Sequence, residues 1–194
     1  MLNLVMHIFL TGEKRAGKSV TIRKFLSQSG KTADGFLTYW KEHNDSTRTL
    51  YLSPASHIIL TNLLTPSQSQ SQSQIPENDK NFPAYILSVD DGRGLSFSEK
   101  TLEVFETYGV DILNNSGNND LIIMDELGFL ETKAPLFREK VMQKIEDNIP
   151  ILGVIKASKT EFLEAIRYHP KVTVKEVTED NRNEVLKWLL SKES

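Results

Sequence analysis

One segment near the start of the chain constrains the fold more than any other. Residues 12–19 read GEKRAGKS and match G-x-x-x-x-G-K-[ST] at every fixed position. An apolar run over residues 4–10 precedes this segment, and a helix-compatible stretch over residues 20–26 follows it. A buried strand, a glycine-containing loop and a helix in this order predict a phosphate-binding loop, the P-loop. Its backbone N–H groups turn inward, and the helix N-terminus adds roughly half a positive charge at the same place.

The P-loop predicts a nucleoside-triphosphate site. Lys18 is expected to neutralise the β- and γ-phosphates, and the Ser19 hydroxyl is expected to hold Mg²⁺. The alternative is a glycine-containing turn with a basic surface, which the flanking strand and helix disfavour. The residues of this segment expected to contact the nucleotide are Gly12, Glu13, Lys14, Arg15, Ala16, Gly17, Lys18, Ser19 and Val20.

Composition limits the domain count, the partners and the location. A chain of 194 residues is long enough for one well-buried core and too short for two. The net charge of −3 and the absence of a basic stripe argue against a nucleic-acid partner. There is no cysteine, which excludes disulfides and thiolate metal sites. No apolar stretch approaches membrane-spanning length, so we expect no membrane contact and a cytoplasmic protein. The oligomeric state is left open.

Strand-like and helix-like segments alternate along the chain. This order predicts an α/β fold with a mostly parallel sheet covered on both faces. A β-hairpin is expected near residues 35–53, because two strand-like runs flank a polar turn. The Ser/Gln-rich residues 66–81 are expected to form a mobile surface loop within one domain spanning residues 1–194, with a functional lid as the alternative. Residues 55–64 fit a short helix or a strand. Further strands are expected at 84–89, 121–124, 149–155 and 171–177, and helices at 98–113, 134–145, 160–168 and 180–190; residues 95–99 read as a helix start.

A second motif supplies two carboxylates. Residues 121–124 form a short apolar strand that ends in Asp125 and Glu126, the pattern of a Walker B strand. In open α/β sheets ligands bind at the carboxyl ends of the strands. We therefore expect Asp125 to join Ser19 in the Mg²⁺ site, through water, and Glu126 to polarise the attacking water. Glu126 and Lys18 are the predicted catalytic residues. An ordinary acidic turn after a strand is the alternative.

Four motifs follow one another along nearly the whole chain: residues 12–19, Gly35-Phe36-x-Thr38, residues 125–131 (DELGFLE) and residues 177–182 (VTEDNR). Together they resemble the small nucleoside-triphosphatases of the THEP1 and cancer-related type. The resemblance implies a RecA-like P-loop core with a catalytic glutamate beside Walker B. It also implies hydrolysis of several nucleoside triphosphates to diphosphates. The preferred base and the biological pathway are left open.

Several charged residues have two readings each. Arg182 is expected near the nucleobase or phosphates, or else is a solvent-facing arginine at a helix start. Arg93 and Arg138 are candidates for a cation that acts on the γ-phosphate, with ordinary turn and helix positions as alternatives. Glu131 is a partner of the magnesium site or, more simply, a charge at a helix N-terminus. The histidines lie on unrelated segments without ligand spacing, which argues against a metal cluster.

Three other functions compete with triphosphate hydrolysis. Asp125–Gly128 satisfies the D-x-x-G pattern of switch GTPases, but residues 155–159 lack the aspartate that selects guanine. A nucleotide or small-molecule kinase would use the same core. Such kinases carry an arginine-rich lid, whereas residues 127–170 contain only Arg138 and Arg167. A slow, nucleotide-dependent regulatory module is the third alternative.

Overall fold

The computed structural model describes residues 6–44, 47–56, 85–90, 95–96, 99–128 and 133–192. The predicted 66–81 loop and most of the ambiguous segment 55–64 lie outside these residues. The helices and strands follow in the order β1 (His7–Thr11), α1 (Lys18–Ser29), β2 (Ala33–Asn44), β3 (Thr47–Pro54), β4 (Tyr85–Asp90), β5 (Leu95–Ser96), α3 (Glu99–Val104), η1 (Phe105–Gly109), α4 (Val110–Asn114), β6 (Leu121–Leu127), α5 (Pro135–Glu146), β7 (Ile151–Ile155), α6 (Glu161–Arg167), β8 (Val172–Glu176) and α7 (Arg182–Ser191).

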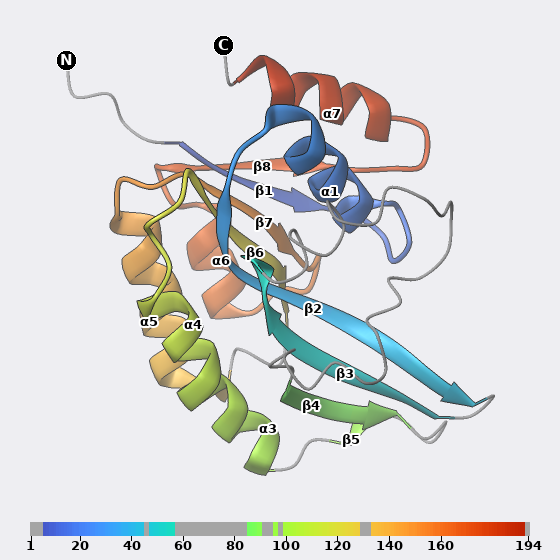
Figure 1. Ribbon diagram of the computed structural model, residues 1–194, viewed down its shortest axis with the longest axis vertical. Coiled ribbons are helices and arrows are strands. Elements are labelled where there is room, and N and C mark those ends of the chain that lie inside the picture. The colour runs from blue at the N-terminus through green and yellow to red at the C-terminus, as the bar shows by residue number, and fades with distance from the viewer. Residues whose placement is uncertain are drawn as a thin grey trace.

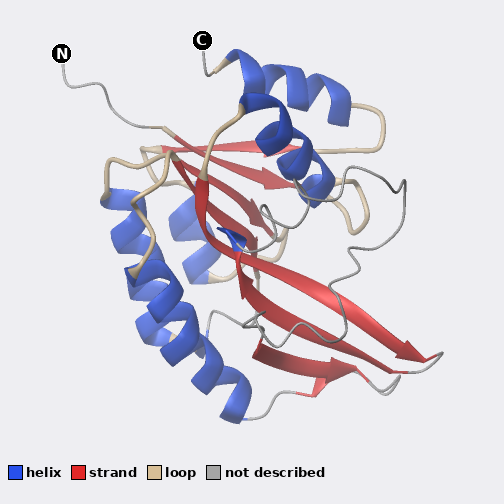
Figure 2. Cartoon of the chain, viewed as in Figure 1, coloured by secondary structure: helices blue, strands red, loops and turns tan. Residues whose placement is uncertain are grey.

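The strands form one sheet in the order β5-β4-β3-β2-β6-β7-β1-β8 (Figures 1 and 2). From β2 to β8 every neighbouring pair is parallel. The β2–β3 hairpin continues the sheet through antiparallel pairs to β4 and β5. In the parallel part, β7 separates the P-loop strand β1 from the carboxylate strand β6. This arrangement confirms the predicted α/β fold with a RecA-like core and a hairpin near residues 35–53.

Helices cover both faces of the sheet and produce two hydrophobic cores. On one face α5, α6 and the α3–α4 segment pack around buried aromatic residues, where the Phe36 and Phe105 rings lie 5.5 Å and 5.1 Å from Phe137. On the other face α1 packs beside α7 (Figure 1). The five residues of β7 are all buried, as expected for a central parallel strand. None of the described helices is long and apolar enough to cross a bilayer.

Two details differ from the sequence-based expectations. Leu95 and Ser96, predicted as a helix start, pair with β4 as a short strand instead. A two-residue strand has no periodic pattern that a sequence can reveal. The helix predicted at residues 98–113 is present as a continuous helical segment, but Phe105–Gly109 forms a π-helical turn in its middle. The other predicted helices and strands that fall on described residues agree to within a few residues.

Candidate nucleotide site

The P-loop connects the end of β1 to the start of α1. Gly12 has φ +134°, and a Cβ atom there would lie 2.2 Å from the Val177 carbonyl oxygen, so only glycine fits. Gly17 caps α1 in the left-handed conformation. Every residue of α1 is described, and the first turn of this helix has neither a side chain that caps it nor an acidic residue. The N-terminal N–H groups and the positive end of the helix dipole are therefore available to an anion.

Lys18 lies over the loop that it was predicted to serve. Its Nζ donates hydrogen bonds to the carbonyl oxygens of Gly12, at 3.0 Å, and Glu13, at 2.7 Å. The ammonium group is thereby held at the loop backbone instead of extending into solvent. The other loop residues that were expected to contact the nucleotide differ in exposure. Ala16 is buried, whereas four are exposed, namely Glu13, Lys14, Arg15 and Val20.

Arg182 is exposed at the start of α7 and also lies beside the P-loop, so both interpretations given from the sequence stay open. A Cβ atom on Gly17 would lie 3.3 Å from Arg182 Cδ and 3.4 Å from its Nη1. The arginine begins α7, and the preceding Val177 donates its backbone N–H to Thr11 at 2.8 Å. The segment before α7 therefore packs against the loop and places the guanidinium group beside it.

Asp125 lies near the end of β6 and contacts the P-loop directly. Its side chain is only 3% exposed, and it accepts a hydrogen bond from the Ser19 hydroxyl. Burial raises the pKa of Asp125 to about 6, and the neighbouring Glu126 raises it as well. The Ser19 hydrogen bond and the charges of Arg23 and Lys18 oppose this shift. The structure thus brings the two predicted magnesium ligands together.

Their chemistry fits Mg²⁺. Hydroxyl and carboxylate oxygens are hard ligands, and Mg²⁺ is commonly held by one or two protein groups while water and substrate phosphates complete its shell. No cluster of three or more His, Asp or Glu side chains that could hold an ion occurs among the described residues. Two protein oxygens would leave the rest of the metal's coordination shell to water and phosphate oxygens.

Glu126 follows Asp125 but has a different environment. Its side chain is 30% exposed, and Lys156 Nζ lies 3.9 Å from its Oε1. Lys156 directly follows β7, and its backbone N–H donates to the Leu127 carbonyl oxygen at 2.9 Å. Because β7 lies between β1 and β6 in the sheet, Lys156 follows the strand next to the P-loop strand, and its side chain lies on the β6 side, beside Glu126. In the sequence, residues 155–159 indicate only that a guanine-reading motif is missing, and no local pattern marks Lys156 as a site residue.

Arg23 is a second residue that the sequence analysis missed. It follows Ser19 by four positions on α1, so the two lie on one helix face, and its charge lowers the pKa of Asp125. Its Nε is buried and has no hydrogen-bond partner within the described part of the chain. The spacing of four residues between Ser19 and Arg23 on a predicted helix was the sequence signal that could have identified Arg23 as a neighbour of the site.

Two of the other sequence candidates lie outside the described residues, namely Arg93 and Glu131. The guanidinium carbon of Arg138 lies 5.8 Å from the centre of the Phe162 ring, a contact that accounts for its position on α5. His7 is buried within β1 and holds three elements together, as discussed below. The expectation that the histidines form no metal cluster stays a prediction, since His57 lies outside the described residues.

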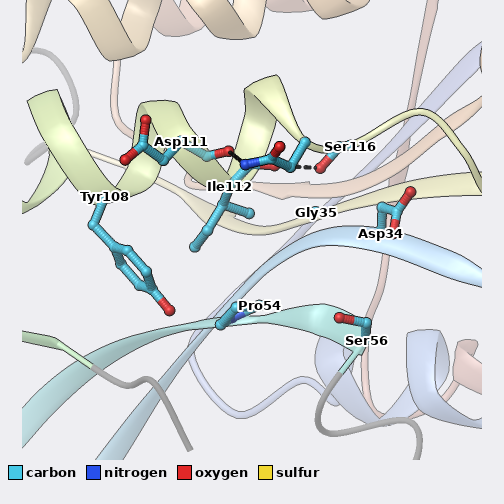
Figure 3. Close-up of a pocket in the computed structure, with 9 residues that line it drawn as sticks. Asp34, Gly35, Pro54, Ser56, Tyr108, Asp111, Ile112 and Ser116 are labelled. Carbon is cyan, nitrogen blue, oxygen red and sulfur yellow. Dashed lines mark hydrogen bonds between the residues drawn. The ribbon is translucent and has the colours of Figure 1, made fainter.

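A separate cavity of about 250 Å³ lies away from the P-loop (Figure 3). The start of β2, the end of β3 and the η1–α4 helix line it. Asp34, at its rim, accepts hydrogen bonds from the backbone N–H groups of Gly117 and Asn118 at 3.1 and 3.2 Å. It also accepts one from Asn119 Nδ2 at 2.5 Å. This carboxylate therefore ties the turn before β6 to β2.

The strand order and the loop geometry are those of a P-loop NTPase. A sequence model of the NTPase family matches residues 79–190, which is more than half of the chain. The chain belongs to this family. The match includes Asp125, Glu126, Lys156 and Arg182 but begins after the P-loop, so the loop geometry is independent evidence.

Individual relatives cover the P-loop as well. Nucleoside-triphosphatase THEP1 of Thermotoga maritima is 27% identical over 199 positions, which cover 96% of this chain and 94% of that protein. The cancer-related nucleoside-triphosphatase of Homo sapiens is 27% identical over 195 positions, with 94% of each chain covered. A crystal structure of THEP1 from Aquifex aeolicus superposes with a TM-score of 0.64 over 96% of this chain and 98% of that chain, at 22% identity. This superposition confirms the fold.

Proposed function

We propose that this protein hydrolyses nucleoside triphosphates, ATP and GTP among them, to diphosphate and phosphate in a Mg²⁺-dependent reaction. The hydrogen bond between Ser19 and Asp125 carries the proposal, because it joins the phosphate loop to the carboxylate strand, on which Glu126 is the next residue. Relatives named nucleoside-triphosphatases, which align along nearly the whole chain, support it. The cytoplasmic location stays a prediction from the sequence.

Each residue of the site has a defined task in this reaction. The N–H groups at the start of α1 and the Lys18 ammonium bind the β- and γ-phosphates. Ser19 and Asp125 hold Mg²⁺, which supplies charge neutralisation on the phosphate oxygens when bound. Arg182, beside Gly17, contacts the nucleotide from the α7 side of the loop.

Glu126 acts on the attacking water. The water oxygen forms a bond to the γ-phosphorus while the bond between that phosphorus and the β–γ bridging oxygen breaks. Glu126 accepts the proton that the water loses, and the nucleoside diphosphate departs with the bridging oxygen. Its partly exposed carboxylate suits this role, since water must reach it, whereas the buried Asp125 is suited to a metal.

The substitution Glu126→Gln tests the proposal against a panel of triphosphates. The variant keeps the size of the side chain but cannot accept the proton, so turnover should fall by about 10²–10⁴-fold. Affinity for the Mg²⁺–triphosphate should stay nearly unchanged, because the interaction is made late in the reaction. Phosphate release, equilibrium binding and thermal unfolding are measured on one preparation.

The matched control is Glu139→Gln, which makes the same change at an exposed position on α5. The control should hydrolyse at the wild-type rate. A Glu126→Gln protein within about threefold of that rate would refute the catalytic role. A lower melting temperature together with weaker binding would instead make Glu126 a structural carboxylate.

A further inference from the structure

A cation lies beside Glu126 at the edge of the sheet that carries the P-loop. Lys156 follows β7, whose neighbours in the sheet are the P-loop strand β1 and the carboxylate strand β6. The carboxyl ends of parallel strands lie at one edge of the sheet, so the strand end that carries Lys156 lies between the strand ends that lead to the P-loop and to Glu126. Its ammonium group lies 3.9 Å from Glu126 Oε1.

The fold fixes the backbone of Lys156 and leaves its ammonium group accessible. Its N–H donates to Leu127, and its carbonyl oxygen accepts a hydrogen bond from Arg167 Nη2. Its stem passes close to Gly128, where a Cβ atom would lie 2.8 Å from Lys156 Cδ. The side chain itself is 55% exposed. The flexible four-carbon stem allows the partly exposed ammonium group to move from Glu126 to an adjacent phosphate.

The ion pair with Glu126 has little value for stability. Both side chains are partly exposed, and pairs of this kind contribute about 0–1 kcal/mol because solvent screens them. A triphosphate bound at the P-loop would bring a larger negative charge into the same space. The pair is therefore better understood as the resting position of a cation that serves the reaction.

We propose that Lys156 is a catalytic cation supplied in cis, which binds the γ-phosphoryl group and stabilises its charge in the transition state. Glu126 holds the lysine in place until the triphosphate arrives. The inference rests on the proposed function. It assigns to the end of β7 the task that other P-loop enzymes give to an arginine finger.

Lys156→Gln, Lys156→Arg and the matched control Lys159→Gln separate this role from a structural one. We expect kcat of Lys156→Gln to fall by about 10- to 100-fold with KM changed less than about threefold, since the charge acts late. Lys156→Arg should recover much of that loss. Lys159 is exposed in the same loop, and its substitution should leave kcat unchanged. Melting temperatures of all variants should agree.

A binding measurement gives a readout that does not depend on turnover. The probe is Mg²⁺–ADP with fluoroaluminate, which mimics the phosphoryl group in flight. Lys156→Gln should bind this complex about 10- to 100-fold more weakly, while its affinity for Mg²⁺–ADP alone stays unchanged. Unchanged affinity for both would overturn the inference. Wild-type protein that released no phosphate from any triphosphate would refute the proposed function instead, and so the two failures are distinct.

Discussion

At the scale of single residues, two adjacent carboxylates have different surroundings and hence different uses. Asp125 is enclosed between β6 and the P-loop, with Ser19 as its hydrogen-bond donor. Glu126 is partly exposed and faces the ammonium group of Lys156. A buried acid near the positive charges of Lys18 and Arg23 suits a divalent cation, whereas a solvent-accessible acid suits a water molecule.

Asp125→Asn should weaken magnesium binding more than nucleotide binding. The amide keeps the shape of the side chain but removes the charge that attracts the metal shell. Loss of one outer-shell partner typically weakens metal affinity about 10- to 100-fold. The measurement is a Mn²⁺ titration, followed by electron paramagnetic resonance, in the presence of a non-hydrolysable triphosphate.

Asp120→Asn is the matched control for this titration. Asp120 lies at the other end of the same strand and accepts hydrogen bonds from the Thr32 N–H and hydroxyl at 3.0 and 2.8 Å. Its substitution should leave Mn²⁺ affinity unchanged. Equal Mn²⁺ affinity for wild type and Asp125→Asn would remove Asp125 from the magnesium site.

At the scale of helices and strands, contacts between neighbours explain what the sequence does not show. The P-loop, β6 and the hairpin were predicted because their signals are local: a motif, an apolar run and paired strand patterns. The position of Lys156 beside Glu126 depends on β7 lying between β1 and β6, which no local pattern encodes. Arg182 was ambiguous for the same reason, since its contact with Gly17 depends on where α7 packs.

His7 joins three elements through one buried imidazole. Its Nε2 donates to the Ile145 carbonyl oxygen in α5 at 2.8 Å, and its Nδ1 accepts from the Ile151 N–H of β7 at 3.2 Å. This pattern requires the neutral ring. Burial lowers the pKa of His7 below its ordinary 6.5. Its contribution to stability is therefore present above that value and is lost as the pH falls through the lowered pKa.

The pH dependence of unfolding should reveal this coupling. Between about pH 7.5 and about pH 5, protonation of His7 should lower the urea midpoint, because acid must protonate a ring that the fold keeps neutral. Protonation of the buried Asp125 acts in the opposite direction in the same range, equally in wild type and variant. In His7→Gln the amide can replace both hydrogen bonds and does not titrate, so the urea midpoint of the variant relative to wild type should rise as the pH falls. Parallel pH profiles for the two proteins would contradict the role given to His7.

At the scale of the whole molecule, the nucleotide site is shared among parts that are far apart in the sequence. The loop after β1, the end of β6 and the segment before α7 meet at one edge of the sheet. A ligand bound at this edge contacts several elements of the folded protein, whereas the unfolded chain has no such site and does not bind the ligand. Binding should therefore stabilise the entire fold by mass action.

Mg²⁺–triphosphate should raise the melting temperature, and Lys18→Ala should abolish the rise. At about one hundred times the dissociation constant a ligand stabilises by about 2.7 kcal/mol. For a protein of this size that corresponds to about 5–10 °C. The measurement is differential scanning calorimetry, with Glu126→Gln present in every protein so that the triphosphate is not consumed. The control is Lys24→Ala, because Lys24 is exposed on the same helix. An equal rise in Lys18→Ala would exclude Lys18 from phosphate binding.

The place of β1 between β7 and β8 has a consequence for biosynthesis. Translation delivers β1 before the other described strands, yet its two partners in the sheet, β7 and β8, follow all of those strands. The Val177 carbonyl that packs against Gly12 comes later still. A nascent chain therefore carries its nucleotide motif well before it can complete the pocket, because the long-range pairing of β1 must wait for more than a hundred further residues. Chains that stop early would carry the motif without the ability to bind.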